Sequence, residues 1–199
     1  MAQAINTLGI VLSGGAGTRV GGQDKGLLPY RGQPVVQHVL SRFAPQVDQI
    51  MISIHRNEDQ YLKFGFPLAM DDAESHQGPM MGVVSALTHA MTMAEMSETT
   101  QHFVIAPCDA PHLPKDYVQR LKQAIEMHSA DCAVSYDGTR RQNLHCLFSI
   151  DAAQSLITYY QSGGRAMHQW FSTVHTVEAD FSSNPSAFQN LNTLSQFNS

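Results

Sequence analysis

Residues 11–34, VLSGGAGTRVGGQDKGLLPYRGQP, combine seven glycines, two arginines, one lysine and one aspartate behind a short apolar run. Glycines without side chains let successive backbone N–H groups approach an anion and cradle phosphate oxygens. Arg19 offers a planar fork for phosphate, and Lys25 offers a compact charge. The stretch therefore predicts a loop that binds and neutralises a triphosphate. The alternative, an ordinary strand-to-helix turn with solvated cations, explains the density of glycine less well.

Two common phosphate loops do not match this stretch. The dinucleotide fingerprint GxGxxG fails because Gly15-Ala16-Gly17 is followed by TRV. The ATPase loop requires GK[ST], whereas the lysine here lies in DKGLL. A different class of nucleotide-binding loop is therefore expected.

Carboxylates follow two other apolar runs. Asp109 comes after residues 102–107 and precedes Ala110-Pro111, so its carboxylate is expected at a strand end. Magnesium prefers such hard oxygen ligands together with phosphate, although a turn or helix-cap aspartate is the alternative. Asp71 and Asp72 could accept hydrogen bonds from a base or a ribose, or be loop residues. Asn192 could supply a second metal ligand or cap the last helix.

Strands and helices alternate along the first two thirds of the chain. Short apolar runs predict strands at residues 8–13, 49–54, 66–70, 102–107 and 132–136, with helices after Pro34 and over 79–96 and 114–129. This order predicts an α/β fold with a mostly parallel sheet covered on both faces. The carboxyl ends of such strands meet at one ligand crevice. Beyond residue 144 the pattern predicts a strand at 145–150, helices at 152–161 and 166–174, then a last strand and a short helix.

Composition favours a single domain over residues 1–199. The 199 residues are 43% hydrophobic, enough for one sizeable core. The net charge of -5 and the absence of a basic stripe argue against nucleic acid as a partner. The first apolar run is too short for a signal or membrane helix, so no membrane association is expected. Three widely spaced cysteines without metal spacing favour a cytoplasmic location.

Four blocks of the chain resemble one family. LSGGAGTRVGGQDKGLLPYRGQPVVQHV, DDAESHQGPMMGVVSAL, FVIAPCDAPHLP and FQNLNTLSQF are similar to the signature of the molybdenum cofactor guanylyltransferases, within the nucleotidyltransferase superfamily. The GGQDKGLL block is the most discriminating of them. The resemblance covers nearly the whole chain and implies a three-layer Rossmann-like nucleotidyltransferase fold.

The resemblance also implies an activity and a set of site residues. GTP and molybdopterin-bound molybdenum would give the guanine dinucleotide cofactor and pyrophosphate, with Mg²⁺ required. Molybdenum-cofactor biosynthesis proteins and molybdoenzyme chaperones would be the protein partners. Arg19, Lys25 and Asp109 would be catalytic, and Asp109 would bind the metal. Carried over by position, the nucleotide contacts would be Leu12, Ser13, Gly14, Gly15, Lys25, Ser53, Asp71 and Asp109.

The chain departs from the family pattern at several positions. Ser53 stands where a guanine-reading asparagine is expected, which leaves cytidylyl transfer open as an alternative. Two further hypotheses are transfer to a sugar phosphate and a non-catalytic nucleotide-binding module. Gln142-Asn143 lacks the usual proline, on the side where the C-terminal part is expected to bind the pterin. Tyr159, Arg165 and Trp170 are candidates for that pocket, although ordinary surface and core roles explain each of them better. His145 is expected to be an ordinary core or surface histidine.

Overall fold

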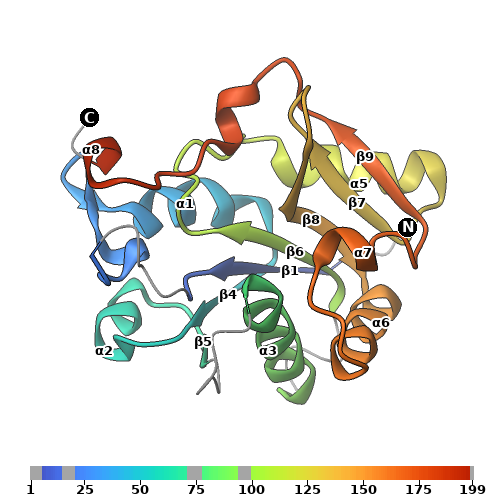
Figure 1. Cartoon of the computed structure of the whole chain (residues 1–199), viewed down its shortest axis with the longest axis horizontal. Helices are drawn as coiled ribbons and strands as arrows, with labels where there is room; N and C mark the ends of the chain where they lie inside the picture. Colours follow the sequence, from blue (N-terminus) through green and yellow to red (C-terminus); the bar gives the residue numbers. More distant parts are fainter. Residues whose placement is uncertain (1–5, 15–20, 71–77, 94–99, 198–199) are drawn as a thin grey trace.

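The computed structural model describes residues 6–14, 21–70, 78–93 and 100–197. Seven strands form one sheet in the order β5-β4-β1-β6-β8-β7-β9 (Figure 1). They are β1 Asn6–Leu12, β4 Gln49–Ile54, β5 Leu68–Met70, β6 Thr100–Pro107, β7 Cys132–Tyr136, β8 Arg141–Ser149 and β9 Thr176–Asp180. A small hairpin pairs β2 Pro29–Tyr30 with β3 Gln33–Pro34.

Helices and short 3-10 turns connect these strands. The α-helices are α1 Val35–Phe43, α2 Glu58–Tyr61, α3 Pro79–Thr92, α5 Tyr117–His128, α6 Ile150–Gln161, α7 Met167–Trp170 and α8 Leu194–Phe197. The 3-10 helices are η2 Lys25–Leu27, η3 Ala44–Gln46, η4 Leu62–Phe64 and η5 Pro185–Phe188.

Strand β8 is antiparallel to both of its neighbours in the sheet. Strands β5, β4, β1 and β6 are mutually parallel, as are β7 and β9, whereas β8 pairs antiparallel with both β6 and β7. Arg141, at the start of β8, lies opposite Tyr136 at the end of β7. The beginning of β8 therefore shares an edge of the sheet with the carboxyl ends of the other strands.

Alternating side chains of the strands build two cores. Leu8, Ile10 and Leu12 of β1 join the cluster under α3, α6 and α7, and Val11 joins the cluster under α1 and α5. This period of two is that of a strand buried on both faces. Figure 1 shows α3 and α6 on one side of the sheet and α1 and α5 on the other. The three-layer, mostly parallel α/β fold expected from the sequence is confirmed.

Local boundaries differ from the expectations mainly in the last third. The strand expected at 145–150 begins at Arg141, because β8 extends along β7 into an exposed, polar region without an apolar pattern. The helix expected over 166–174 is only the four-residue α7. The described part of the helix expected over 79–96 ends at Thr92. Among the described helices none is long and apolar enough to cross a membrane.

Candidate active site

Three polar side chains from distant parts of the chain meet at the carboxyl edge of the sheet. Lys25 lies in η2, and Asp109 lies two residues beyond the end of β6. The Lys25 ammonium is 2.5 Å from Asp109 Oδ2 and 2.8 Å from Asn192 Oδ1. The segment carrying Asn192 is fixed beside Asp109, because the Leu191 N–H donates to the Asp109 carbonyl at 2.9 Å. Lys25 and Asp109, which the sequence predicts as site residues, therefore form one cluster with Asn192, the candidate second metal ligand.

Asp109 has an unused acceptor in this cluster. The residue is 8% exposed, and its Oδ1 atom is buried with no hydrogen-bond partner among the described residues. A buried carboxylate oxygen without a partner is costly unless a ligand satisfies it. Asp109 therefore has one oxygen committed to Lys25 and another available to a cation or a donor.

Asp24 fixes the short helix that carries Lys25. Its carboxylate accepts from the Gly26 N–H at 3.2 Å, from the Tyr61 hydroxyl at 2.7 Å and from Asn57 Nδ2 at 2.9 Å. The first bond is an N-cap for η2. The other two tie this helix to α2 and to the residue before it. Asp24, to which the sequence pattern assigns no role, is a positioning residue for Lys25.

Tyr61 links this helix to the end of β1. Its hydroxyl donates to Asp24, so at the 2.6 Å contact with Ser13 Oγ the serine hydroxyl is the donor. Burial, reinforced by the nearby Cys108 and Asp24, raises the pKa of Tyr61 far above its usual value. Burial, with Asp109 as the next cause, raises the pKa of Cys108 to about 12. Both groups therefore stay protonated and neutral at physiological pH.

Gly26 lies where these side chains leave no room for another atom. A Cβ built there would overlap Ser13 Oγ and Tyr61 Oη, and would also contact Cys108 Sγ at 3.4 Å. The absence of a side chain, rather than an unusual backbone angle, is what this position requires. The glycine in the DKGL motif thus lets Lys25 approach the end of β1.

Gly26→Ala is expected to destabilise the protein by about 1–3 kcal/mol, because it overpacks a fully occupied site. Urea denaturation would measure the loss of unfolding free energy. Ser13→Ala removes one of the two clashing oxygens, so Ser13→Ala/Gly26→Ala should regain part of the loss. Additive effects of the two substitutions would contradict this packing explanation.

The other predicted nucleotide contacts have varied placements. Gly14 is exposed at the edge, Ser13 is 5% exposed, and Leu12 belongs to the core. Ser53 is fully buried, and its hydroxyl donates to the Gly82 carbonyl at 3.2 Å. This contact turns the hydroxyl toward α3, which does not favour a role in reading a base. Gly15, Arg19 and Asp71 lie outside the described residues.

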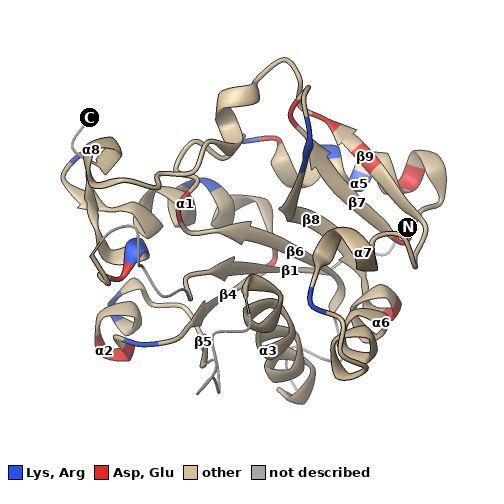
Figure 2. Cartoon of the chain, viewed as in Figure 1, with Lys and Arg blue, Asp and Glu red and all other residues tan. Residues whose placement is uncertain are grey.

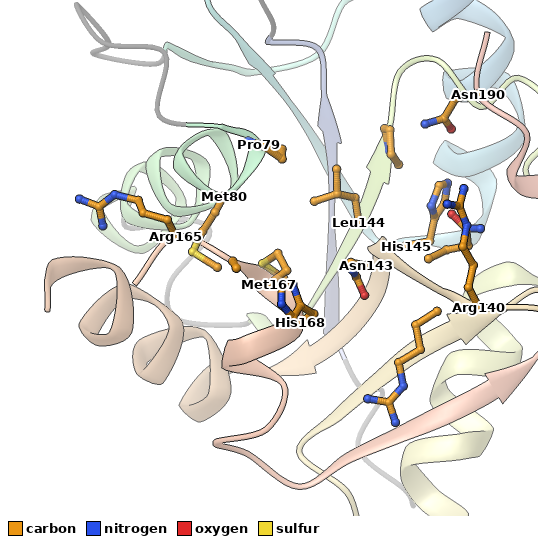
Figure 3. A pocket seen from close by; sticks show the side chains of 14 residues that line it. Pro79, Met80, Arg140, Asn143, Leu144, His145, Arg165, Met167, His168 and Asn190 are labelled. Atoms are coloured by element: carbon orange, nitrogen blue, oxygen red, sulfur yellow. The ribbon is translucent and has the colours of Figure 1, made fainter. Parts of the chain in front are cut away.

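A pocket of about 380 Å³ adjoins the cluster. Pro107 and Asn190 on its wall each lie two residues from a member of the cluster, Asp109 and Asn192. The other lining residues are Pro79, Met80, Arg140, Arg141, Gln142, Asn143, Leu144, His145, Arg165, Ala166, Met167 and His168. Figure 3 shows Arg165 on one side of the pocket and Arg140, His145 and Asn190 on the other.

The pocket is electropositive. Three arginines line it, and the described lining residues include no aspartate or glutamate. Figure 2 shows blue at the start of β8 and in the segment before α7, which are two of its walls. Arg141 pairs with Glu178 at 2.8 Å, whereas Arg140 has no side-chain partner among the described residues. The pocket is therefore suited to an anionic ligand.

Asp137 shapes the turn that delivers Arg140. Its carboxylate accepts from the backbone N–H of Thr139 and of Arg140, both at 2.8 Å, and from Gln142 Nε2 at 2.5 Å. Burial alone would raise the pKa of Asp137, but these hydrogen bonds, with one from the Thr139 hydroxyl, hold it well below its usual range. The ionised carboxylate thus keeps this wall of the pocket in place.

His145 and Asn190 present buried polar atoms without partners. His145 is 2% exposed, and its Nε2 atom and the Asn190 Oδ1 atom have no hydrogen-bond partner among the described residues. Burial lowers the pKa of His145 to about 3, so its ring is neutral near pH 7. The sequence pattern does not identify Arg140 or Asn190, and it predicts an ordinary role for His145. No local pattern brings these three positions together.

The residues predicted to line this pocket are distributed differently. Arg165 does line it. Trp170 is fully buried in the core under α6 and α7, with its indole N–H 3.4 Å from Ser155 Oγ, so it has the core role that was the alternative to lining the pocket. Tyr159 is also not a lining residue, because Gly164 packs against its ring and its hydroxyl donates to Gln169 Oε1.

Comparisons with known proteins agree with this geometry. The model of the MobA-like NTP transferase domain matches residues 9–177. The molybdenum cofactor guanylyltransferase of Cupriavidus metallidurans is 39% identical over 193 residues, covering 94% of this chain and 91% of its own. That of Shewanella loihica is 37% identical over 187 residues, with the same coverages.

Solved structures share the fold. The molybdopterin-guanine dinucleotide biosynthesis protein A from Archaeoglobus fulgidus matches with a TM-score of 0.71 at 21% identity, covering 96% of this chain and 95% of its own. A CMP:2-keto-3-deoxy-manno-octonic acid synthetase complexed with CTP matches with a TM-score of 0.64 at 14% identity, covering 96% and 94%. At these identities the likeness concerns the fold alone. From the family model and the full-length curated relatives together, the chain belongs to the MobA-like NTP transferases and, within them, to the molybdenum cofactor guanylyltransferase family.

Proposed function

We propose that this protein transfers GMP from GTP to molybdenum-molybdopterin, forming the molybdopterin guanine dinucleotide cofactor and pyrophosphate. The observation that carries the proposal is the 37–39% identity to molybdenum cofactor guanylyltransferases along 94% of the chain. The cluster of Lys25, Asp109 and Asn192 beside an electropositive pocket supports it. A nucleotide and an anionic acceptor could meet at this place.

The nucleotide would bind at the cluster. Lys25 and Arg19 would neutralise its phosphates, and the segment from Leu12 to Gly15 would contact it. Because the Ser13 N–H donates to the Ser53 carbonyl at 2.7 Å, the backbone N–H groups for the phosphates would come from Gly14 and Gly15. Asp71 remains the proposed contact to the nucleoside. Ser53 would act as a support, because its hydroxyl donates to the Gly82 carbonyl and its own carbonyl accepts from the Ser13 N–H at 2.7 Å. The base would therefore be selected by groups other than this hydroxyl.

The reaction is a displacement at the α-phosphorus of the nucleotide. An oxygen of the terminal phosphate of molybdopterin forms the new bond, the α–β phosphoanhydride bond breaks, and pyrophosphate leaves with the electron pair. The attacking phosphate is already ionised near neutral pH, so no general base is needed. Alignment and stabilisation of charge should supply most of the rate enhancement. Lys25 is the described residue best placed to stabilise charge on the leaving pyrophosphate.

The residues present fit a magnesium ion. Asp109 Oδ1 is a buried carboxylate oxygen without a partner, and Asn192 Oδ1 is the second oxygen of the cluster. The described residues contain no group of three or more His, Cys, Asp or Glu side chains that could hold a metal on their own. This suits Mg²⁺, which is usually held by one or two protein ligands plus substrate phosphates and water. When bound, it would neutralise charge on the phosphates of the nucleotide.

Molybdopterin would bind in the 380 Å³ pocket, built largely from the C-terminal part of the chain. The N-terminal part would then bind the nucleotide, within a single domain. Ligand pockets of this kind commonly measure about 300–1,000 Å³, so the volume fits one cofactor-sized molecule. The three arginines on its wall favour the phosphate and the anionic metal centre of that substrate.

We place the protein in the cytoplasm, with proteins of molybdenum-cofactor biosynthesis and molybdoenzyme chaperones as partners. Its three cysteines are free and buried, which suits a reducing compartment.

Incubation with molybdopterin, Mg²⁺ and each nucleoside triphosphate in turn tests the proposal, with release of pyrophosphate as the measurement. We expect release with GTP alone. Release with CTP alone would identify a cytidylyltransferase instead. Nucleotide binding without turnover would identify a non-catalytic binding module.

A further inference from the structure

The 380 Å³ pocket in which we place molybdopterin, the acceptor substrate, has a histidine on its wall whose ring nitrogen makes no hydrogen bond within the described part of the fold. His145 is fixed edge-on against Phe188, with ring centroids 4.8 Å apart, and against Tyr117 at 6.1 Å. His145 lines the pocket, and its Nε2 atom is buried and has no hydrogen-bond partner among the described residues. A buried polar atom left in this state weakens the fold unless a ligand completes it.

A charged partner is the wrong ligand for this atom. The ring is buried and neutral, so it offers one N–H donor or one lone pair, and it adds no charge to the pocket. Asn190 Oδ1, the other unpartnered atom on this side, is a neutral acceptor. Together they would suit the edge of a planar heterocycle that carries both N–H and carbonyl groups.

Arg140 supplies a different chemistry at the same pocket. It is exposed, has no side-chain partner among the described residues, and is held at its position by the turn that Asp137 organises. The other two arginines are partly committed, Arg141 to Glu178 and Arg165 to the backbone carbonyls of Tyr160 and Gly164. Arg140 is therefore the arginine of this pocket most available to an anionic group.

We propose that His145 Nε2 hydrogen-bonds the polar edge of a pterin ring and that Arg140 holds an anionic substituent of the same molecule. The two residues would make this pocket specific for an anionic pterin. This inference rests on the proposed function, because it takes the acceptor to be a pterin. It assigns specificity to two positions that no motif of the sequence identifies.

Fluorescence titration with two pterins separates these roles. 6-Carboxypterin carries an anionic group, and 6-methylpterin is its uncharged counterpart. His145→Leu should weaken binding of both by about 10-fold, the usual effect of losing one neutral hydrogen bond. Arg140→Gln should weaken 6-carboxypterin by about 10-fold or more and leave 6-methylpterin unchanged. His128→Gln, an exposed histidine at the end of α5, is the matched control.

His145→Gln is the control for a folding defect in His145→Leu. It keeps a polar group at this position and should bind the pterins more tightly than His145→Leu. In wild-type protein labelled with ¹⁵N-histidine, the Nε2 resonance of His145 should shift when 6-methylpterin is added. Wild-type protein that binds neither pterin, unchanged affinities in His145→Leu, or an unshifted resonance would each overturn the inference. Affinity for GTP should be the same in all variants, and an equal loss for GTP would also overturn it.

These measurements need no turnover, so they separate the inference from the proposed function. Pterin binding that depends on His145, together with an absence of pyrophosphate release, would reject guanylyl transfer and keep the pocket assignment. Pyrophosphate release with GTP, together with no effect of His145 on pterin affinity, would keep guanylyl transfer and reject the pocket assignment.

Discussion

Replacing Lys25 by methionine is expected to lower the rate of pyrophosphate release by about 10²–10³-fold, the usual loss when one well-placed stabilising group is removed from a site of this kind. The methionine side chain retains much of the length and loses the charge. The ammonium is the group that would meet the phosphates, since it already lies between Asp109 and Asn192 at the edge of the sheet. Single-turnover measurements with saturating GTP would report the effect on chemistry directly.

The same substitution should tighten the binding of Mn²⁺ to the protein without nucleotide. In the structure the ammonium lies 2.5 Å from Asp109 Oδ2 and 2.8 Å from Asn192 Oδ1, which is one of the two oxygens proposed to hold the ion. Like charges a few ångströms apart repel strongly in a partly buried site, so a divalent cation must displace Lys25 first. Electron paramagnetic resonance of free Mn²⁺ should show about 10-fold tighter binding in Lys25→Met. Nucleotide phosphates would normally draw the lysine away.

Lys63→Met is the matched control, because Lys63 is exposed and lies outside the cluster. It should change neither the rate nor the affinity for Mn²⁺. Adding Asn192→Ala to Lys25→Met should weaken Mn²⁺ binding again if the ion uses the Asn192 oxygen. Equal Mn²⁺ affinity in wild type and Lys25→Met would show that the ammonium does not exclude the cation.

Asp109→Asn is expected to reduce turnover by at least about 10³-fold, because it removes the only carboxylate at the cluster among the described residues. Asparagine keeps the volume and one acceptor oxygen, so the loss would come from charge. The variant should also bind Mn²⁺ less tightly than wild type in the presence of GTP. Steady-state pyrophosphate release and Mn²⁺ titration would measure the two effects.

Asp116→Asn provides the comparison for this variant. Asp116 has a side chain 53% exposed and lies 3.8 Å from Arg120, so its loss should affect neither measurement. A thermal unfolding curve for Asp109→Asn would separate a catalytic defect from a folding defect. Turnover within a few-fold of wild type would exclude Asp109 from the catalytic machinery.

The sequence predicted the first half of the fold well because its signals there are local. Each early strand is a short apolar run that ends in glycine or a polar residue. The helix expected after Pro34 is α1, which buries Val35, Val36, Val39, Leu40 and Phe43 on one face. Lys25 and Asp109 were identified for the same reason, since each lies directly in a motif. The direct contact between them follows from the parallel order of the strands.

The pocket proposed for molybdopterin was less predictable, because its residues are brought together only by the tertiary structure. Arg140, His145 and Asn190 come from a turn, a strand and the C-terminal segment, and only the antiparallel insertion of β8 brings the first two to the carboxyl edge. For Trp170 the sequence left a pocket role and a core role open, because an aromatic residue in a loosely patterned segment fits either. Burial beneath α6 and α7 decided that question.

The bond from Lys25 to Asn192 joins positions 167 residues apart. During synthesis on the ribosome, strands β1 to β8, the last of which ends at Ser149, emerge well before Asn192 does. Until that moment the ammonium lacks its second oxygen partner, and the segment after Phe188 cannot dock beside Asp109. A nascent chain would therefore form most of its sheet before the contact that completes this cluster.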